Sequence, residues 1–183
     1  MKGTVQLNTY NNDHFNPGAG KIKRALWHIV NALFFNSFFH FYGLKIALLK
    51  LFGAEVGVNV LIKPYVNIKY PWNLIIGNDV WIGENVWIDN LEKVQIGNSV
   101  CLSQGALLLC GNHDYKKSTF DLITGTIILE DGVWIGAKSI VCGNVICHSH
   151  SVLSVNSVAA RNLDAYTIYK GNPATPIKER IIE

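Results

Sequence analysis

The stretch Ile76-Gly77-Asn78-Asp79-Val80-Trp81-Ile82-Gly83-Glu84-Asn85-Val86-Trp87-Ile88 decides the fold. An aliphatic residue returns at every sixth position of it, and Gly follows the first two of these residues. The same interval continues elsewhere in the chain, at Val56, Ile62, Ile68, Ile96, Leu102, Leu108, Leu129, Ile135, Val141, Cys147 and Leu153. A fixed six-residue period is typical of a parallel β-helix, in which each hexad forms one short strand and one corner. The sequence therefore predicts an all-β solenoid.

Interruptions of this period predict the cross-section. The interval lengthens to eight residues before Ile76 and before Ile96, and to twenty-one before Leu129. Each interruption follows three hexads, so three hexads make one coil of triangular section, and the interruptions share one edge. The longest one extrudes a loop, residues 109–128, and loops on a rigid scaffold commonly carry function. Stacking of coils predicts that Asp89 and Asn90 lie beside the root of this loop.

We expect one domain with three parts. Residues 1–55 form an N-terminal arm and helical segment, residues 56–158 form the β-helix, and residues 159–183 form a C-terminal tail. The helical segment and the tail are suited to cap the two open ends of the solenoid, whose end strands would otherwise be unpaired. Pro173 and Pro176 in the tail would stop strand growth.

Residues 21–52 combine a basic start with a long uncharged, aromatic-rich run. Leu44, Leu48 and Leu51 share one side of a helix. His28 and His40 are read as packing residues, and such polar groups disfavour a helix that spans a bilayer. Two interpretations remain open: packing on the solenoid end or a neighbouring subunit, and contact with a membrane surface.

Composition excludes several classes of function. Hydrophobic residues make up 49% of the chain and charged residues 16%, which excludes a disordered chain. The net charge of +3 is too small to indicate nucleic-acid binding. Four cysteines without a C-x-x-C pair, and no signal peptide, indicate reduced thiols and a cytoplasmic protein, with membrane association left open. Cys110 at the loop root has no evident base beside it.

Several further motifs carry a resemblance to a known family. The chain resembles the hexapeptide-repeat (left-handed β-helix) acyltransferases, and within them it is most similar to the colanic acid biosynthesis acetyltransferases. The residues that carry the resemblance are Leu51-Phe52-Gly53-Ala54, Val60–Pro64, Tyr70-Pro71-Trp72, Ser103-Gln104, Gly111–Tyr115, Trp134-Ile135-Gly136 and Gly171-Asn172-Pro173-Ala174. It covers about residues 20–183. The spacing itself does not give handedness; the resemblance implies a left-handed helix.

The resemblance implies a homotrimeric O-acetyltransferase that uses acetyl-coenzyme A. The expected acceptor is a hydroxyl of a sugar or lipid-linked sugar in surface polysaccharide biosynthesis. His113 stands where the family has its catalytic base, and a neutral imidazole is well matched to proton removal at neutral pH. A loop backbone amide is expected to stabilise the oxyanion.

Asp89 is where the chain departs from related sugar acetyltransferases, which place an Asn near this point. Its role therefore stays open between a ligand of the acceptor hydroxyl, an orienter of His113, and a residue that only bonds its own turn. Asn90, Asn112 and Asp114 complete the expected acceptor-binding set.

The donor site is likewise implied by the resemblance, in a groove between adjacent subunits. Trp134 and Ala137 match positions along the pantetheine arm, and Lys178 matches a phosphate-binding one. The remaining matches are Ser154 and Val155, at a backbone contact, and Ala160 and Arg161, near the nucleotide. Thr175 stands where Arg is common, which leaves one phosphate contact in doubt.

No catalytic metal is expected. His148 and His150 lack the spacing of the three-His zinc sites known on this kind of solenoid. Two rival functions remain: an N-acyltransferase acting on a nucleotide-linked amino sugar, and a non-catalytic scaffold subunit.

Overall fold

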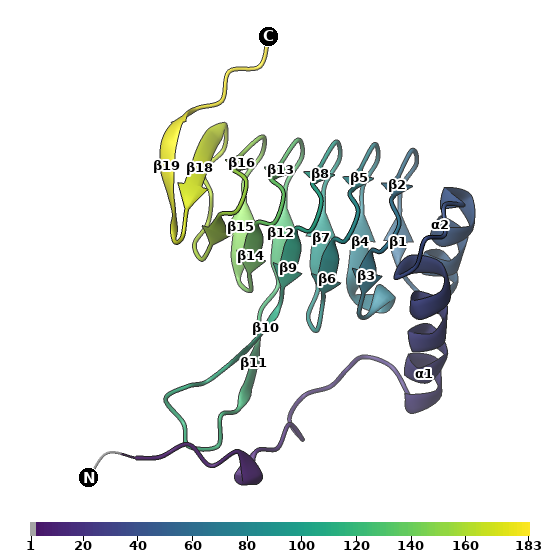
Figure 1. Cartoon of the computed structure of the whole chain (residues 1–183), viewed down its shortest axis with the longest axis vertical. Coiled ribbons are helices and arrows are strands. Elements are labelled where there is room, and N and C mark those ends of the chain that lie inside the picture. Colours follow the sequence, from purple (N-terminus) through teal and green to yellow (C-terminus); the bar gives the residue numbers. More distant parts are fainter. Residues whose placement is uncertain (1–2) are drawn as a thin grey trace.

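The structure, a computed structural model, describes residues 3–183 and is a parallel β-helix of about six turns (Figure 1). The predicted class is confirmed: an all-β solenoid with an N-terminal helical segment and a C-terminal tail. Each coil contributes one strand to each of three stacked parallel sheets, which form the three faces of a prism.

We name the faces A, B and C in the order in which the chain visits them. Face A consists of β1 (Glu55–Val56), β4 (Leu74–Ile76), β7 (Val94–Ile96), β12 (Ile127–Leu129) and β15 (Val145–Cys147). Face B consists of β2 (Leu61–Ile62), β5 (Trp81–Ile82), β8 (Cys101–Leu102), β13 (Trp134–Ile135), β16 (Val152–Leu153), β18 (Thr167–Gly171) and β19 (Ala174–Glu179). Face C consists of β3 (Asn67–Ile68), β6 (Trp87–Asp89), β9 (Leu107–Leu109), β14 (Ile140–Cys142) and β17 (Val158–Ala159).

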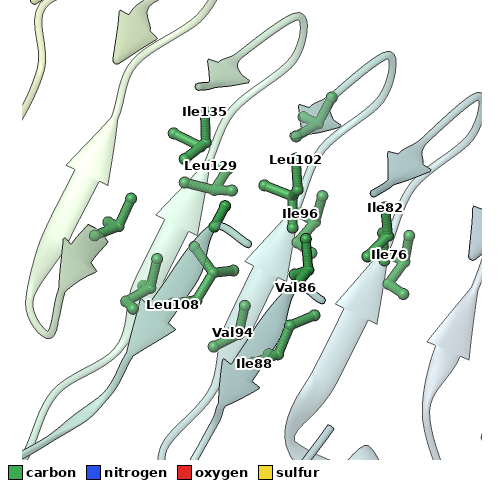
Figure 2. Close-up of a cluster of buried hydrophobic side chains, with 14 of the residues drawn as sticks. Ile76, Ile82, Val86, Ile88, Val94, Ile96, Leu102, Leu108, Leu129 and Ile135 are labelled. Carbon is green, nitrogen blue, oxygen red and sulfur yellow. The ribbon is translucent and has the colours of Figure 1, made fainter. Parts of the chain in front are cut away.

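The aliphatic residues of the hexads fill the prism. Equivalent positions stack in register, so Ile76 pairs with Ile96 and Ile82 with Leu102. Figure 2 shows these side chains pointing into the interior, where each is at most 2% exposed. Burial of each such side chain contributes about 1.5–3 kcal/mol, which makes the six-residue period the main source of stability.

The Gly-Asn corner between faces A and B joins neighbouring coils through side chains. Oδ1 of Asn78 accepts the backbone N–H of Val58 at 2.9 Å, and Oδ1 of Asn98 accepts that of Asn78 at 2.9 Å. A Cβ at Gly77 would lie 2.8 Å from Oδ1 of Asn98, which is too close. Gly is therefore required at position 77 because the Asn98 amide of the next coil occupies that space.

A helical cap, residues 21–51, closes the first coil (Figure 1). It comprises α1 (Lys21–Val30), the π-helical turn η2 (Asn31–Phe35) and α2 (Tyr42–Leu51). Trp27 Nε1 donates to the carbonyl of Ile68 at 2.8 Å, and Oδ1 of Asn31 accepts the N–H of Ile68. These bonds satisfy backbone groups that an open solenoid end would leave unpaired.

The buried side of α2 differs from the predicted one. Lys45 and Leu49 are fully buried, whereas Leu44 and Leu51 are exposed. The Lys45 ammonium donates to the carbonyls of Ile62 and Lys63, at 3.3 and 2.9 Å. Burial lowers the Lys45 pKa to about 8. Lys45 therefore faces the solenoid because its ammonium binds carbonyl groups at the strand ends. The pattern of apolar residues in the sequence does not predict this contact.

The C-terminal tail closes the opposite end of the prism. Strand β18 continues face B in parallel with β16, and β19 turns back antiparallel to it. Asp164 accepts a hydrogen bond from the Tyr169 hydroxyl at 2.9 Å and secures the turn before β18. None of the helices within residues 3–183 has the length and apolar character needed to cross a bilayer.

Candidate active site

A hairpin marks the edge between faces C and A, which we call the hairpin edge. Strand β9 leaves face C and continues as β10 (Gly111–His113), which pairs antiparallel with β11 (Leu122–Thr124) before the chain enters face A. Asp89, which lies in the coil below the hairpin, pairs with Leu109. The structure thus brings Asp89 to the hairpin root, where the interrupted period placed it.

His113, the last residue of β10, is held by the hairpin itself. Its Nδ1 lies 2.9 Å from the carbonyl oxygen of Phe120, and the Phe120 ring stacks on the imidazole at 4.4 Å between centroids. A carbonyl only accepts hydrogen bonds, so Nδ1 must be the protonated nitrogen of the neutral ring. Nε2 is therefore the nitrogen that can accept a proton.

A polar pocket of about 440 Å³ opens beside His113. Asp89, Asn112 and Gly111 line it from the prism and hairpin, and Lys69 and Tyr70 line it from the coil below. A Cβ at Gly111 would lie 2.7 Å from Leu91, so the backbone here can only be Gly without displacement. We call this space the His113 pocket.

The N-terminal arm supplies the outer wall of this pocket, which the sequence did not indicate. Tyr10, Asn12 and Phe15 line the pocket, and the Tyr10 ring meets His113 edge-on at 5.8 Å. Figure 1 shows the arm running along the hairpin. Backbone N–H of Gln6 donates to the carbonyl of Ser118 at 2.8 Å and fixes the two segments together.

Asp89 is 6% exposed and forms an ion pair with Lys69. Its Oδ1 is buried and lies 2.8 Å from the Lys69 ammonium, which compensates its charge. Asp89 also lines the His113 pocket, so its carboxylate is placed beside a bound acceptor. Because Phe120 already holds Nδ1 of His113, Asp89 does not orient the imidazole through that nitrogen.

The other three residues expected to bind acceptor have different surroundings. Asn90 is fully buried, and its amide bonds both the N–H and the carbonyl of Tyr70, so it braces the coil below and does not line the pocket. Asn112 lines the pocket, and its Oδ1 accepts the N–H of His113 at 2.8 Å. Asp114 accepts the N–H of Lys116 and shapes the hairpin turn outside the pocket.

The Cys110 thiol does not serve as a nucleophile here. It is 1% exposed, and burial raises its pKa to about 12. At neutral pH it is a thiol, whereas the reactive form is the thiolate.

A second cavity, of about 580 Å³, lies on face B. Four residues of the expected donor site line it together: Trp134, Ala137, Ser154 and Val155. Ser103, Gln104 and Arg180 also line it and were not predicted as site residues. Trp134 Nε1 donates to Oγ of Ser103 at 2.9 Å, which fixes the indole along the groove. We call this cavity the face-B groove.

The remaining donor-site candidates do not line the face-B groove. Lys178 in β19 is exposed and pairs with Ile168, which lines the end of the face-B groove. Ala160 and Arg161 are exposed and follow β17, so they lie at the hairpin edge of the last coil. The expected donor set is thus divided between two sides of the prism.

The positions of His113 and of the face-B groove on the prism determine whether one chain can form a complete site. The hairpin edge joins faces C and A, so in a triangular section it lies opposite face B. Figure 1 shows the hairpin and the corners of β13 and β16 on opposite sides of the solenoid. His113 and the face-B groove of one chain therefore cannot act on the same reacting atoms.

The histidines near the C-terminal end do not form a metal site in the part of the chain that the structure describes. Among residues 3–183, no three His, Cys, Asp or Glu side chains are placed to hold an ion. His148 instead bonds Glu130, with Nδ1 and Oε1 3.0 Å apart. Hydrogen bonds from Ser149 and His148 lower the Glu130 pKa.

Comparison with known proteins places the chain in a family. It is 34% identical over 165 residues to "Putative colanic acid biosynthesis acetyltransferase WcaF" of Escherichia coli strain K12, covering 90% of this chain and 91% of that protein. It is 24% identical over 136 residues to the galactoside O-acetyltransferase of the same strain, covering 73% and 67%. No family model matches the chain.

Solved structures share the fold. The hexapeptide-repeat acetyltransferase VCA0836 of Vibrio cholerae, in complex with acetyl-coenzyme A, superposes with a TM-score of 0.81 at 21% identity, covering 96% and 97% of the two chains. The N-acyltransferase AntD of Bacillus cereus superposes with a TM-score of 0.64 at 24% identity, covering 80% and 91%. The chain belongs to the hexapeptide-repeat acetyltransferases. It is an acyltransferase, related to an acetyltransferase named for colanic acid biosynthesis.

Proposed function

We propose that this enzyme transfers an acetyl group from acetyl-coenzyme A to a hydroxyl of a sugar or lipid-linked sugar during surface polysaccharide biosynthesis. The observation that carries the proposal is the His113 imidazole, whose Nδ1 is bonded to the Phe120 carbonyl while the ring lines a polar pocket. This arrangement leaves Nε2 as the base. The family relationship supports the donor and the polysaccharide setting.

The chemistry follows from this geometry. Nε2 of His113 takes the proton of the acceptor hydroxyl as its oxygen attacks the carbonyl carbon of the thioester. The tetrahedral oxyanion collapses, the carbon–sulfur bond breaks, and the imidazolium returns the proton to the leaving thiolate. The products are an acetyl ester and free coenzyme A, and a positioned base of this kind contributes about 10²–10⁴-fold in rate.

The Asp89–Lys69 pair favours a hydroxyl acceptor over an amine. The two charges compensate each other at 2.8 Å, so the His113 pocket has no free carboxylate to hold an ammonium group. The Asp89 carboxylate lines the pocket and can accept a hydrogen bond from a neutral sugar hydroxyl.

The face-B groove is the proposed donor site, with the indole of Trp134 along the pantetheine arm and Lys178 and Arg180 near the phosphates. Because His113 and this groove lie on opposite sides of one prism, we infer that the enzyme is a homotrimer. In such a trimer the hairpin edge of one subunit faces the groove of the next, and both halves of each site meet at the interface.

The test is release of thiol from acetyl-coenzyme A across a panel of sugars and amino sugars, with the product identified by mass spectrometry. We expect His113→Ala to lower turnover by about two to four orders of magnitude while coenzyme A binding persists. His148→Ala, on a His bonded to Glu130 outside the pocket, is the matched control and should retain activity. A His113→Ala enzyme within a few-fold of the wild type, or acetylation of amino sugars only, would contradict the proposal.

A further inference from the structure

The outer side of the helical cap carries an apolar stripe that the fold does not use. Ile22, Leu26, Ile29 and Leu33 succeed one another at intervals of four, three and four residues and are 79, 52, 55 and 60% exposed. Helical geometry places them on one side of α1 and its continuation into η2. We call these four residues the apolar stripe.

The opposite side of the same helix already performs the capping. Trp27 is 2% exposed, donates to the Ile68 carbonyl, and packs 5.2 Å from the rings of Phe35 and Phe52. The stripe lies across the helix from these contacts, so it faces away from the prism. Phe38, Phe41 and Leu51 add further exposed apolar side chains to the cap, at 73, 71 and 76%.

Charge distinguishes this surface from the rest of the chain. No Asp or Glu occurs between His14 and Ala54, whereas this segment contains Lys21, Lys23, Arg24, Lys45 and Lys50. The segment thus carries +5 of formal charge, and the remainder of the chain carries −2, since the total is +3. Lys21 and Lys50 are exposed, whereas Lys45 is buried and the Lys23 ammonium lies over the Trp72 ring at 5.1 Å.

We propose that the helical cap docks on an anionic lipid bilayer, with the apolar stripe in the acyl-headgroup boundary and the exposed cations on lipid phosphates. An amphipathic helix of this composition, about 15 Å long for the ten residues of α1, lies flat in the interface and is too short to span it. A cleft of about 370 Å³, whose lining includes Arg24 and His28 of the cap, opens beside this helix.

A second copy of the chain is a poorer occupant of this surface. The cores of protein interfaces are depleted of charge, and two identical caps would bring uncompensated cations together. A bilayer with anionic headgroups complements both features of the cap at once. The inference does not require the proposed acetyl transfer, because lipid binding can be measured without any acceptor.

The test is flotation of the purified full-length chain with vesicles of phosphatidylcholine, alone or mixed with phosphatidylglycerol. We expect binding to the mixed vesicles that weakens with added salt. The double variant Leu26→Gln with Ile29→Gln should lose at least about tenfold in partitioning, because two aliphatic side chains no longer enter the interface. The double variant Ile181→Gln with Ile182→Gln is the matched control, since these exposed aliphatics lie in the tail and should not affect binding.

A charge variant, Lys21→Gln, should weaken binding to the mixed vesicles and leave the weak binding to pure phosphatidylcholine unchanged. Absence of wild-type binding to mixed vesicles, or equal binding of the stripe variant, would overturn the inference. So would light scattering without lipid in which the stripe variant alone dissociates to a smaller assembly, because the stripe would then join copies of the chain.

Discussion

Asp89 combines burial, an ion pair with Lys69 and a place in the wall of the His113 pocket. If it binds the acceptor hydroxyl, Asp89→Asn should raise the acceptor KM by about ten- to a hundredfold, in line with the loss of a charged hydrogen bond. The limits of the pH–rate profile should not move, because the Phe120 carbonyl holds the His113 ring.

Steady-state kinetics across pH on Asp89→Asn provide this measurement. Asp114→Asn is the control, as that carboxylate shapes the hairpin turn outside the pocket. An acidic limb that shifts downward while the acceptor KM stays constant would instead assign Asp89 the task of orienting His113.

Lys45 gives a second prediction at this scale. Its pKa is about 8 in the folded chain against 10.5 for an unperturbed lysine, because burial penalises the ammonium form. Between these two values the unfolded chain binds more protons than the native one, so this residue makes the free energy of unfolding rise with pH. The substitution Lys45→Met should remove this increase of the free energy of unfolding with pH.

Urea unfolding at several pH values from 7 to 10 would compare the wild type, Lys45→Met and Lys50→Met, the last being an exposed lysine on the same helix. At neutral pH we expect Lys45→Met to be less stable by about 1–3 kcal/mol, because the carbonyls of Ile62 and Lys63 lose their donor. A stability difference between wild type and Lys45→Met that does not change with pH would show that Lys45 keeps an ordinary pKa.

Among the elements, the N-terminal arm closes the His113 pocket although it has almost no regular structure. Tyr10 meets the imidazole edge-on at 5.8 Å and forms part of the pocket wall. We expect Tyr10→Ala to raise the acceptor KM by roughly two- to tenfold, the value of one aromatic contact, with little change in the donor KM.

Kinetics with acceptor and donor varied separately would check this expectation. Leu7→Ala is the control, since Leu7 belongs to the same arm, is 64% exposed and does not line the pocket. Equal effects of both substitutions on the acceptor KM would mean that the arm acts only as a tether.

The two halves of the candidate site were not equally predictable. The hexad period places His113 and Asp89 at one edge because each coil contains three hexads and every interruption falls after the third. Tyr10 could not be found in this way, because the arm has no period and is joined to the hairpin through backbone groups of Gln6 and Ser118. Phe120 was equally invisible, since it acts on His113 through a carbonyl that every residue possesses.

At the scale of the whole molecule, the position of His113 opposite the face-B groove predicts complementation between subunits. His113→Ala removes the base, and Ala137→Trp should block the groove, so each variant alone should be inactive. Each mixed trimer should regain about one site in three, because one of its three interfaces pairs an intact His113 with an intact groove.

Activity of the purified mixed trimer, with each variant carrying a different affinity tag, gives the answer. Trimers assembled from two differently tagged His113→Ala chains are the control and should remain inactive. A site contained in one chain could not be rebuilt by mixing, so an inactive mixed trimer would refute a shared site.

The Asn side chains at the corner between faces A and B allow one coil to be repeated. The bonds from Val58 to Asn78 and from Asn78 to Asn98 each span twenty residues, so neighbouring coils present the same groups to one another. A duplicated segment 77–96 would offer an Asn to the coil before it and accept one from the coil after it. The prism would lengthen by one coil with its edges aligned, and the hairpin would lie one coil further from the helical cap. The distance between the helical cap and the C-terminal tail can therefore be changed in steps of one coil.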